Sequence, residues 1–228
     1  MDFLIDSFVS ALRLIGSLSP DVADAVRTSL AVSAGATVFA ALFGIPLGVL
    51  VGLADFPLKR LVVLGLNTLM AVPTVVIGLL VYGFLSRQGP LGVLGLLFTP
   101  TAIVIGGVLL AAPIVANYSL ASVRGADPRI LPTALTLGAG RFRAVGTLVG
   151  EIRFGILAAV IAGFGRVVSE VGVAMMLGGN IRGYTRTMTT AIALETSKGE
   201  FAFGMALGIV LMMVAFSVNL LLNLLQQR

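Results

Sequence analysis

The sequence predicts an all-α membrane protein with about five transmembrane helices. First, 58% of its 228 residues are hydrophobic and only 11% are charged, whereas a soluble domain carries about 25% charged residues. Second, long intervals of the chain contain no charged side chain, and each can hold the roughly 20 apolar residues that cross a bilayer core as a helix. Third, most charged residues lie between these intervals, as expected where a charge at the bilayer centre is costly.

The composition also excludes several classes of function. The chain has no Cys and no His, so it has no disulfide or thiolate metal site, and it lacks the commonest general base. It has no phosphate loop of the form G-x-x-x-x-G-K-[ST], which ATP-hydrolysing subunits use. We therefore expect no enzyme activity, cofactor or metal in this chain. The net charge of +5 is interpreted as cytoplasmic loop charge, not as a nucleic-acid surface.

Residues 1–27 are predicted to form an N-terminal segment at the membrane interface. Asp2 and Asp6 stand where a secretory signal peptide would carry positive charge, so no such peptide is expected. Arg13 interrupts the apolar residues around it, and this pattern suits an amphipathic helix on the membrane surface better than a span. Residues 28–228 are expected to form a single transmembrane bundle.

Five intervals with few or no charges locate the spans. Pro46, Pro73 and Pro113 lie within the first three and favour kinks, because each removes a backbone hydrogen bond. The residues before the third span are rich in Gly and Pro, which places the start of that span after them. The predicted spans are approximately residues 28–54, 61–86, 101–123, 154–177 and 201–225.

Three glycines repeat at four-residue spacing along the first span. Gly44, Gly48 and Gly52 therefore share one helical face. Small residues at this spacing let two membrane helices approach closely. We predict that another helix packs along this face.

The fourth span differs from the others because it contains Arg166 and Glu170. Residues four apart share a helical face, so these two side chains can form an ion pair. One interpretation is a buried pair that only locks helix packing. The other is a polar element that faces the bundle interior or a permeation path, which is usual for charges inside a membrane. We favour the second.

The interval 124–153 is too long and too basic for a simple connector between spans, which needs only a few residues. It contains five Arg and two acidic residues, and this excess of positive charge predicts a cytoplasmic location. Residues 133–137 and 142–149 have helix-forming character on either side of Gly138 and Gly140. We expect two short helices joined at an angle, forming a surface on which a partner docks.

The run from Asp127 to Ala139 (Asp-Pro-Arg-Ile-Leu-Pro-Thr-Ala-Leu-Thr-Leu-Gly-Ala) resembles the cytoplasmic EAA…G loop of binding-protein-dependent ABC importer permeases. In that family the loop forms a coupling helix that sits in a groove of the ATP-hydrolysing subunit. Pro132 stands in place of the family's usual Glu, and Gly150-Glu151 replaces the Leu-Pro that often closes the motif. The match centres on Ala134, Leu137, Gly138 and Ala139.

The resemblance implies a type I ABC importer transmembrane domain with a coupling-helix loop between spans three and four. Arg141, Phe142 and Arg143 follow the motif directly and become further candidate contacts to the ATPase. The two Arg side chains either pair with acidic groups of that partner or act only as positive charges that hold the loop in the cytoplasm.

A second segment is similar to the oxyanion importer permeases for molybdate, tungstate and sulfate. It comprises residues 165–172 and the run Met-Met-Leu-Gly-Gly-Asn that begins at Met175, and residues 180–197 look most like tungstate-type permeases. This resemblance implies an ATP-driven importer of an oxyanion, tungstate or molybdate, that works by alternating access. It makes four residues candidates for the gate or translocation path: Arg166, Glu170, Met175 and Met176.

The resemblance also implies partners. We expect a homodimer of this chain in the inner cell membrane, two ATP-binding cassette subunits that carry ATP and Mg, and an extracytoplasmic substrate-binding protein. With the central loop cytoplasmic, alternation of the spans places the N-terminus outside, residues 178–200 outside and the C-terminus inside. Membrane lipid surrounds the dimer, and no nucleic acid is expected.

The outer segment 178–200 carries basic and hydroxyl side chains that suit a tetrahedral dianion. The same groups suit contact with a binding protein, and the sequence leaves both interpretations open. Two alternatives also remain open for the function: a permease for sulfate, phosphate or another anion, and a secondary transporter or channel that needs no ATPase. The outer-segment candidates are Arg182, Arg186, Thr185, Thr187, Thr189 and Thr190.

Overall fold

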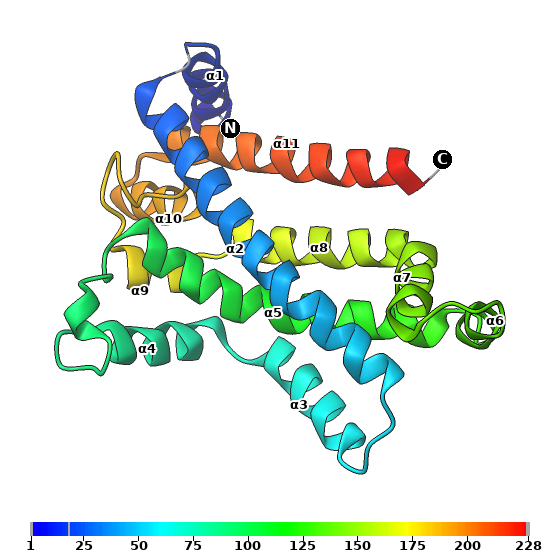
Figure 1. Cartoon of the computed structure of the whole chain (residues 1–228). Coiled ribbons are helices and arrows are strands. Elements are labelled where there is room, and N and C mark those ends of the chain that lie inside the picture. The colour runs from blue at the N-terminus through cyan, green and yellow to red at the C-terminus, as the bar shows by residue number, and fades with distance from the viewer. Residues whose placement is uncertain (1, 18, 227–228) are drawn as a thin grey trace.

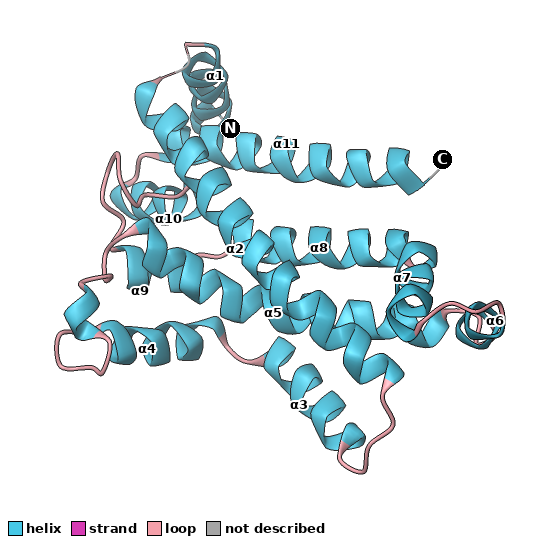
Figure 2. Ribbon diagram, viewed as in Figure 1, coloured by secondary structure: helices cyan, strands magenta, loops and turns pink. Residues whose placement is uncertain are grey.

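The computed structural model describes residues 2–17 and 19–226, and within these ranges the secondary structure is helical throughout, with no strand (Figures 1 and 2). The elements are α1 (Asp2–Gly16), α2 (Pro20–Leu53), α3 (Lys59–Ala71), α4 (Thr74–Leu85), the 3-10 turn η1 (Gly92–Leu94), α5 (Pro100–Gly125), α6 (Ile130–Thr136), α7 (Arg141–Glu151), α8 (Arg153–Val168), α9 (Gly172–Gly178), α10 (Met188–Lys198) and α11 (Phe201–Gln226).

The helices α2, α5 and α11 are each long and apolar enough to cross a membrane. Two further candidate spans are bent pairs, with angles of 96° between α3 and α4 and 68° between α7 and α8. The all-α prediction with about five spans is therefore confirmed, but two of the spans are not straight helices.

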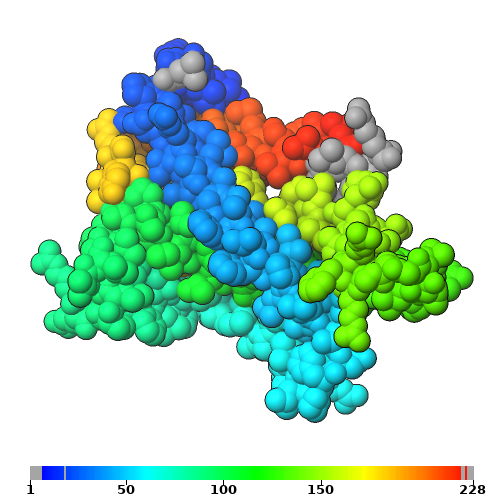
Figure 3. All heavy atoms as spheres, in the orientation of Figure 1, coloured from blue at the N-terminus to red at the C-terminus, as the bar shows by residue number. Residues whose placement is uncertain are grey.

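The bundle has two distinct ends (Figure 1). The helices α6 and α7 lie at one end together with the C-terminal end of α11, while η1, α9 and α10 lie at the other. The space-filling view shows that the α6–α7 region and α3 project from the body of the bundle (Figure 3). This arrangement agrees with the alternation of spans expected from the sequence.

The predicted second span, 61–86, is interrupted at Val72 and Pro73, which have extended backbone angles. Pro73 has no N–H to donate and disfavours helical angles at the preceding residue. In contrast, α2 continues through Pro46 and α5 continues through Pro113. Of the three prolines expected to kink a helix, Pro73 therefore breaks it, while the helices continue through Pro46 and Pro113.

Two other predicted boundaries differ from the structure. The boundary expected at residue 28 falls inside α2, which begins at Pro20 because Ser19 accepts a hydrogen bond from the Val22 amide (3.4 Å) and proline suits the first helical position. The predicted fourth span, 154–177, is divided, since α8 ends at Val168 and α9 begins four residues later. The interfacial placement of the N-terminal segment stays a prediction, although α1 packs against α11.

The contact between α2 and α5 forms the centre of the bundle. A methyl group on Gly44 would lie 2.9 Å from the carbonyl oxygen of Ala112, and one on Gly48 would overlap the carbonyl oxygen of Ala116. A methyl group on Gly52 would lie 2.7 Å from a side-chain carbon of Val123. All three glycines therefore face α5, Gly44 and Gly48 at contact distance from its backbone, and the predicted small-residue face is confirmed.

Replacing Gly48 with Ala should destabilise the protein by about 1–3 kcal/mol, the usual effect of overfilling a packed interface. Gly208→Ala on α11 is the matched control, because no atom lies within 4 Å of the added methyl group and Ala favours a helix over Gly by about 1 kcal/mol. Thermal unfolding of both purified variants in detergent measures the effect. Equal melting temperatures would show that the α2–α5 contact tolerates a side chain.

Candidate functional site

Three regions contain the residues predicted to act: the α6–α7 loop, the α8–α9 break and the outer segment before α10. In the first, α6 and α7 confirm the two predicted short helices, with slightly longer bounds. Gly138 has φ +86°, a left-handed conformation that side chains rarely adopt. Its amide donates to the Leu135 carbonyl and the Ala139 amide to the Ala134 carbonyl, both at 3.0 Å. The glycine of the motif therefore makes the turn that ends α6.

Large apolar side chains on the α6–α7 loop are exposed to solvent. Leu137 is 83% exposed and Phe142 is 97% exposed, and the side chains of Arg141 and Arg143 beside them are also exposed. The candidates Ala134 and Ala139 are half-buried. An exposed apolar patch with a charged rim is typical of a protein interface.

The opposite face of α7 is anchored to the bundle. Leu148 and Ile152 are buried in one cluster with Val49 of α2 and Val123 of α5. Only Ile152 separates α7 from α8. A force applied to the exposed loop is therefore transmitted to the end of the α2–α5 pair and into α8.

An ion pair holds the start of this loop. Arg129 Nη2 lies 2.7 Å from Asp127 Oδ2, and the Arg129 amide donates to Asp127 Oδ1 at 2.9 Å. The guanidinium, with help from the amide, lowers the pKa of the Asp127 carboxyl below its usual value of 3.8. Since the pKa of Asp127 is lower in the folded state than in the unfolded state, the ion pair stabilises the turn at neutral pH. This stabilisation is lost as the pH falls through the folded-state pKa. Both side chains are exposed to solvent.

At the second region, Glu170 connects α8, α9 and the first turn of α10. Arg166 Nη1 lies 3.2 Å from Glu170 Oε2, so the predicted ion pair is confirmed. The other carboxylate oxygen accepts a hydrogen bond from the Val173 amide at 3.2 Å, and the backbone carbonyl accepts one from Thr189 at 2.7 Å. Glu170 is 7% exposed. These contacts stabilise the break between α8 and α9, while a role in a permeation path stays a prediction.

A cavity beside Glu170 has a volume of about 10 Å³. Its walls include Ser29, Ser33 and Thr187. This volume holds at most a single water molecule. A tetrahedral oxyanion therefore does not fit beside Glu170 in this conformation.

The two methionines predicted at the gate lie on α9, half-buried. Met176 packs on α4, where its sulfur would lie 2.9 Å from a methyl group on Gly78. On its other side α9 packs into α5, since Val173 and Leu177 fill the space at Gly106. The short helix is therefore a wedge between α4 and α5 at the outer end of the bundle.

In the outer segment, the hydroxyl groups of the four candidate threonines are already bonded within the chain. The Thr185 hydroxyl donates to the Gly178 carbonyl, and Thr187 with Thr190 forms a reciprocal cap at the start of α10. Together with Thr189 these threonines are at most 5% exposed. Their placement does not support contact with a passing anion.

The two outer arginines also have acidic partners. Arg182 Nε lies 2.7 Å from Asp21 Oδ1 at the start of α2, and Arg186 Nη1 lies 3.5 Å from Glu195 Oε1 of α10. Both pairs fix the outer segment to neighbouring helices. Their charge is therefore largely compensated, which weakens the prediction of an anion-attracting surface at these positions.

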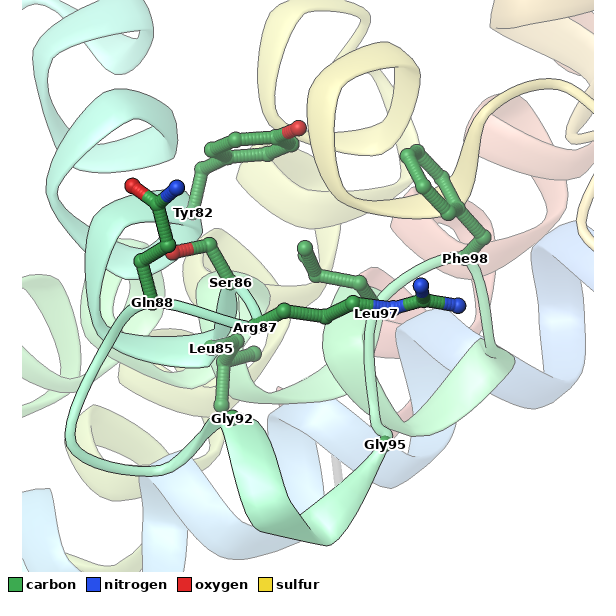
Figure 4. A pocket seen from close by; sticks show the side chains of 9 residues that line it. All are labelled: Tyr82, Leu85, Ser86, Arg87, Gln88, Gly92, Gly95, Leu97 and Phe98. Carbon is green, nitrogen blue, oxygen red and sulfur yellow. The ribbon is translucent and has the colours of Figure 1, made fainter.

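Sequence reasoning missed a cavity of about 600 Å³ at the outer end, between the end of α4 and the loop of residues 86–98, where Arg87 and Gln88 lie near Tyr82 and Phe98 (Figure 4). Phe98 has φ +61°, packs edge-on against Tyr82, and donates its amide to the Leu177 carbonyl of α9 at 2.8 Å. The Gly-rich residues before Phe98 were the signal for this irregular segment. The cavity is thus connected directly to the α9 wedge.

Comparison with known proteins adds independent findings. Residues 44–228 match the family model described as "Binding-protein-dependent transport system inner membrane component". The chain is 41% identical to the tungstate uptake system permease protein of Peptoclostridium acidaminophilum, with both chains covered completely. It is 40% identical to the protein of the same name from Campylobacter jejuni, covering 100% of this chain and 95% of that one.

A solved structure confirms the fold. A bacterial ABC transporter involved in the import of the acidic polysaccharide alginate superimposes with a TM-score of 0.76 at 19% identity. The superposition covers 97% of this chain and 83% of that one. The fold expected from the loop motif is therefore present.

Replacing Glu170 with Ala should lower the stability by about 1–3 kcal/mol, because the Val173 amide and Arg166 both lose a partner. Glu170→Gln keeps an acceptor and should lose less. A double-mutant cycle with Arg166→Met, followed by thermal unfolding in detergent, isolates the ion-pair contribution. A Glu170→Ala variant as stable as the wild type would show that these contacts do not hold the α8–α9 break.

Proposed function

The chain belongs to the family of binding-protein-dependent transport system inner membrane components, and we propose that it is the permease subunit of an ATP-driven tungstate importer. The assignment of tungstate as the substrate rests on the 41% identity to a tungstate permease over the whole of both chains. The α6–α7 loop couples this chain to an ATPase, because its apolar patch is exposed while Leu148 and Ile152 pack it against α2 and α5.

The ATPase is a separate subunit in this proposal. The chain has no phosphate loop, so ATP and Mg bind to two ATP-binding cassette subunits. Leu137 and Phe142 of each copy enter an apolar groove on one cassette subunit. Arg141 and Arg143 pair with acidic groups at the rim of that groove. This docking places the α6–α7 end of the bundle, together with the C-terminus, in the cytoplasm.

The translocation path requires a second copy of the chain. About five spans are too few to enclose a path, so a two-fold homodimer forms the pore on its axis. The opposite end, with η1, α9 and α10, faces the extracytoplasmic binding protein and lies outside together with the N-terminus. The inner cell membrane is the expected location.

Transport follows alternating access. ATP binding brings the two cassette subunits together and moves the α6–α7 loops with them. Since only Ile152 separates α7 from α8, α8 moves with the loop and shifts the break after Val168. Helix α9 then moves out from between α4 and α5, and this movement opens the outer end of the bundle to the binding protein.

The pore selects weakly among tetrahedral dianions, because a path that must release its solute cannot bind it tightly. Molybdate has the same charge and geometry as tungstate and is the expected competitor. Sulfate and phosphate permeases are the remaining alternatives of the same class. The relatives reported above give no support to a secondary transporter or channel.

Replacing Phe142 with Ala should weaken assembly with the ATPase at least about tenfold, because a buried aromatic anchor typically contributes 1.4 kcal/mol or more. The side chain is 97% exposed, so the bundle itself should fold normally. The matched control is Val93→Ala, which is 98% exposed at the other end. Copurification with the cassette subunit measures the loss, and wild-type assembly of Phe142→Ala would refute the docking model.

Cells that express the complete transporter should accumulate labelled tungstate, and a tenfold excess of molybdate should compete at least partly. The physical reason is the identical charge and tetrahedral geometry of the two anions. Measured uptake with excess sulfate or phosphate provides the comparison. Uptake that is blocked by phosphate but indifferent to molybdate and unlabelled tungstate would contradict the proposed substrate.

A further inference from the structure

A groove runs between α3 and α5 and ends at the same end of the bundle as α6 and α7. It consists of two adjoining cavities of about 470 and 610 Å³, which share Val63 and Arg124 in their walls. The inner cavity is lined by Asn67, Asn117 and Tyr118, and the mouth by Lys59 and Arg60. We call the two together the α3–α5 groove.

The inner cavity has polar side chains among apolar ones and lies between α3 and α5, which both belong to candidate spans. Asn67 and Asn117 each lie about 12 Å along their helices from the α6–α7 end. The Asn117 amide donates only to the sulfur of Met70 at 3.0 Å, a weak acceptor. Such side chains usually face a water-filled cavity.

Two of the three polar side chains have unused hydrogen-bonding capacity. Within residues 2–17 and 19–226, the side chains of Asn67 and Tyr118 make no hydrogen bond. Both are exposed on the surface of the single chain. Amide N–H and phenol O–H groups are neutral donors, which bind an anion weakly enough to release it.

The mouth of the groove is positively charged. Lys59 bonds to the Gly52 carbonyl and to Asp55, both at 3.2 Å. In the part of the chain that the structure describes, Arg60 and Arg124 form no ion pair and are exposed. Their charge attracts a dianion toward the cytoplasmic end.

We propose that the α3–α5 groove of each copy opens onto the pore between the two copies and forms the exit half of the oxyanion's route, which rests on the proposed function above. Asn67, Asn117 and Tyr118 donate hydrogen bonds to the oxygens of the anion inside the membrane, and Arg124 with Arg60 receives it at the mouth. The route thus uses neutral donors at depth and cations only at the water boundary, where a charge is least costly.

The absence of cysteine from the natural chain permits a direct test in the assembled transporter. Asn117→Cys and Asn67→Cys should react with a negatively charged methanethiosulfonate from the cytoplasmic side at least about tenfold faster than Phe216→Cys, because a thiol surrounded by hydrocarbon does not ionise. Phe216 is the control since it is 68% exposed on α11, an outer helix. Equal rates at all three positions would overturn the proposal.

Protection then identifies the anion. In proteoliposomes of phosphatidylcholine alone, tungstate should slow the labelling of Asn117→Cys several-fold. If phosphatidylglycerol slows the labelling of Asn117→Cys and tungstate does not, the groove binds a lipid headgroup, and the proposed route is overturned. The labelling rates do not depend on the substrate of the importer, so they remain informative if tungstate uptake by the wild type fails.

Transport by substituted complexes gives the second measurement. Asn117→Leu and Tyr118→Phe should reduce tungstate uptake at least about tenfold while assembly and ATP hydrolysis persist. Thr68→Val is the matched control, because its hydroxyl bonds to the Leu64 carbonyl of its own helix at 2.8 Å. Wild-type uptake by both groove variants in an active importer would refute the groove while leaving the proposed function intact.

Discussion

The close approach of α2 and α5 is the constraint on which the rest of the bundle depends. Lipid provides no hydrophobic force between helices, so association rests on close packing of small residues. Gly44, Gly48 and Gly52 bring α2 to the backbone of α5, and α5 in turn provides the surface for α8 and α9. At Gly163 of α8 a methyl group would lie 2.9 Å from Val115, so that contact uses the same device.

Around this packed pair two candidate spans are interrupted, at Pro73 and at Glu170. The α3–α4 break at Pro73 and the α8–α9 break at Glu170 both lie against α5 or its neighbours. At the other end, Leu148 and Ile152 join the exposed α6–α7 loop to the end of the α2–α5 pair. A rigid centre with broken helices beside it suits a protein that moves a docking loop and a distant gate together.

The sequence predicted what depends on local pattern. Gaps between charges located the helices, glycine spacing located the α2–α5 face, and the loop motif with Gly138 located the α6–α7 turn. It did not predict partners far apart in the chain, such as Asp21 with Arg182. Nor did it predict that four threonines are buried or that Asn67 and Asn117 face one groove, because both depend on how helices cross. Pro73 signalled a bend, but its 96° angle is set by packing.

The central claim is that the energy for transport enters through the α6–α7 loop from a separate ATPase. Proteoliposomes with this chain, its cassette subunits and a tungstate-loaded binding protein measure this directly. The account predicts that labelled tungstate accumulates against its gradient only when ATP, Mg and the cassette subunits are all present. Accumulation by this chain without the cassette subunits, at the same rate and with no response to ATP, would contradict it.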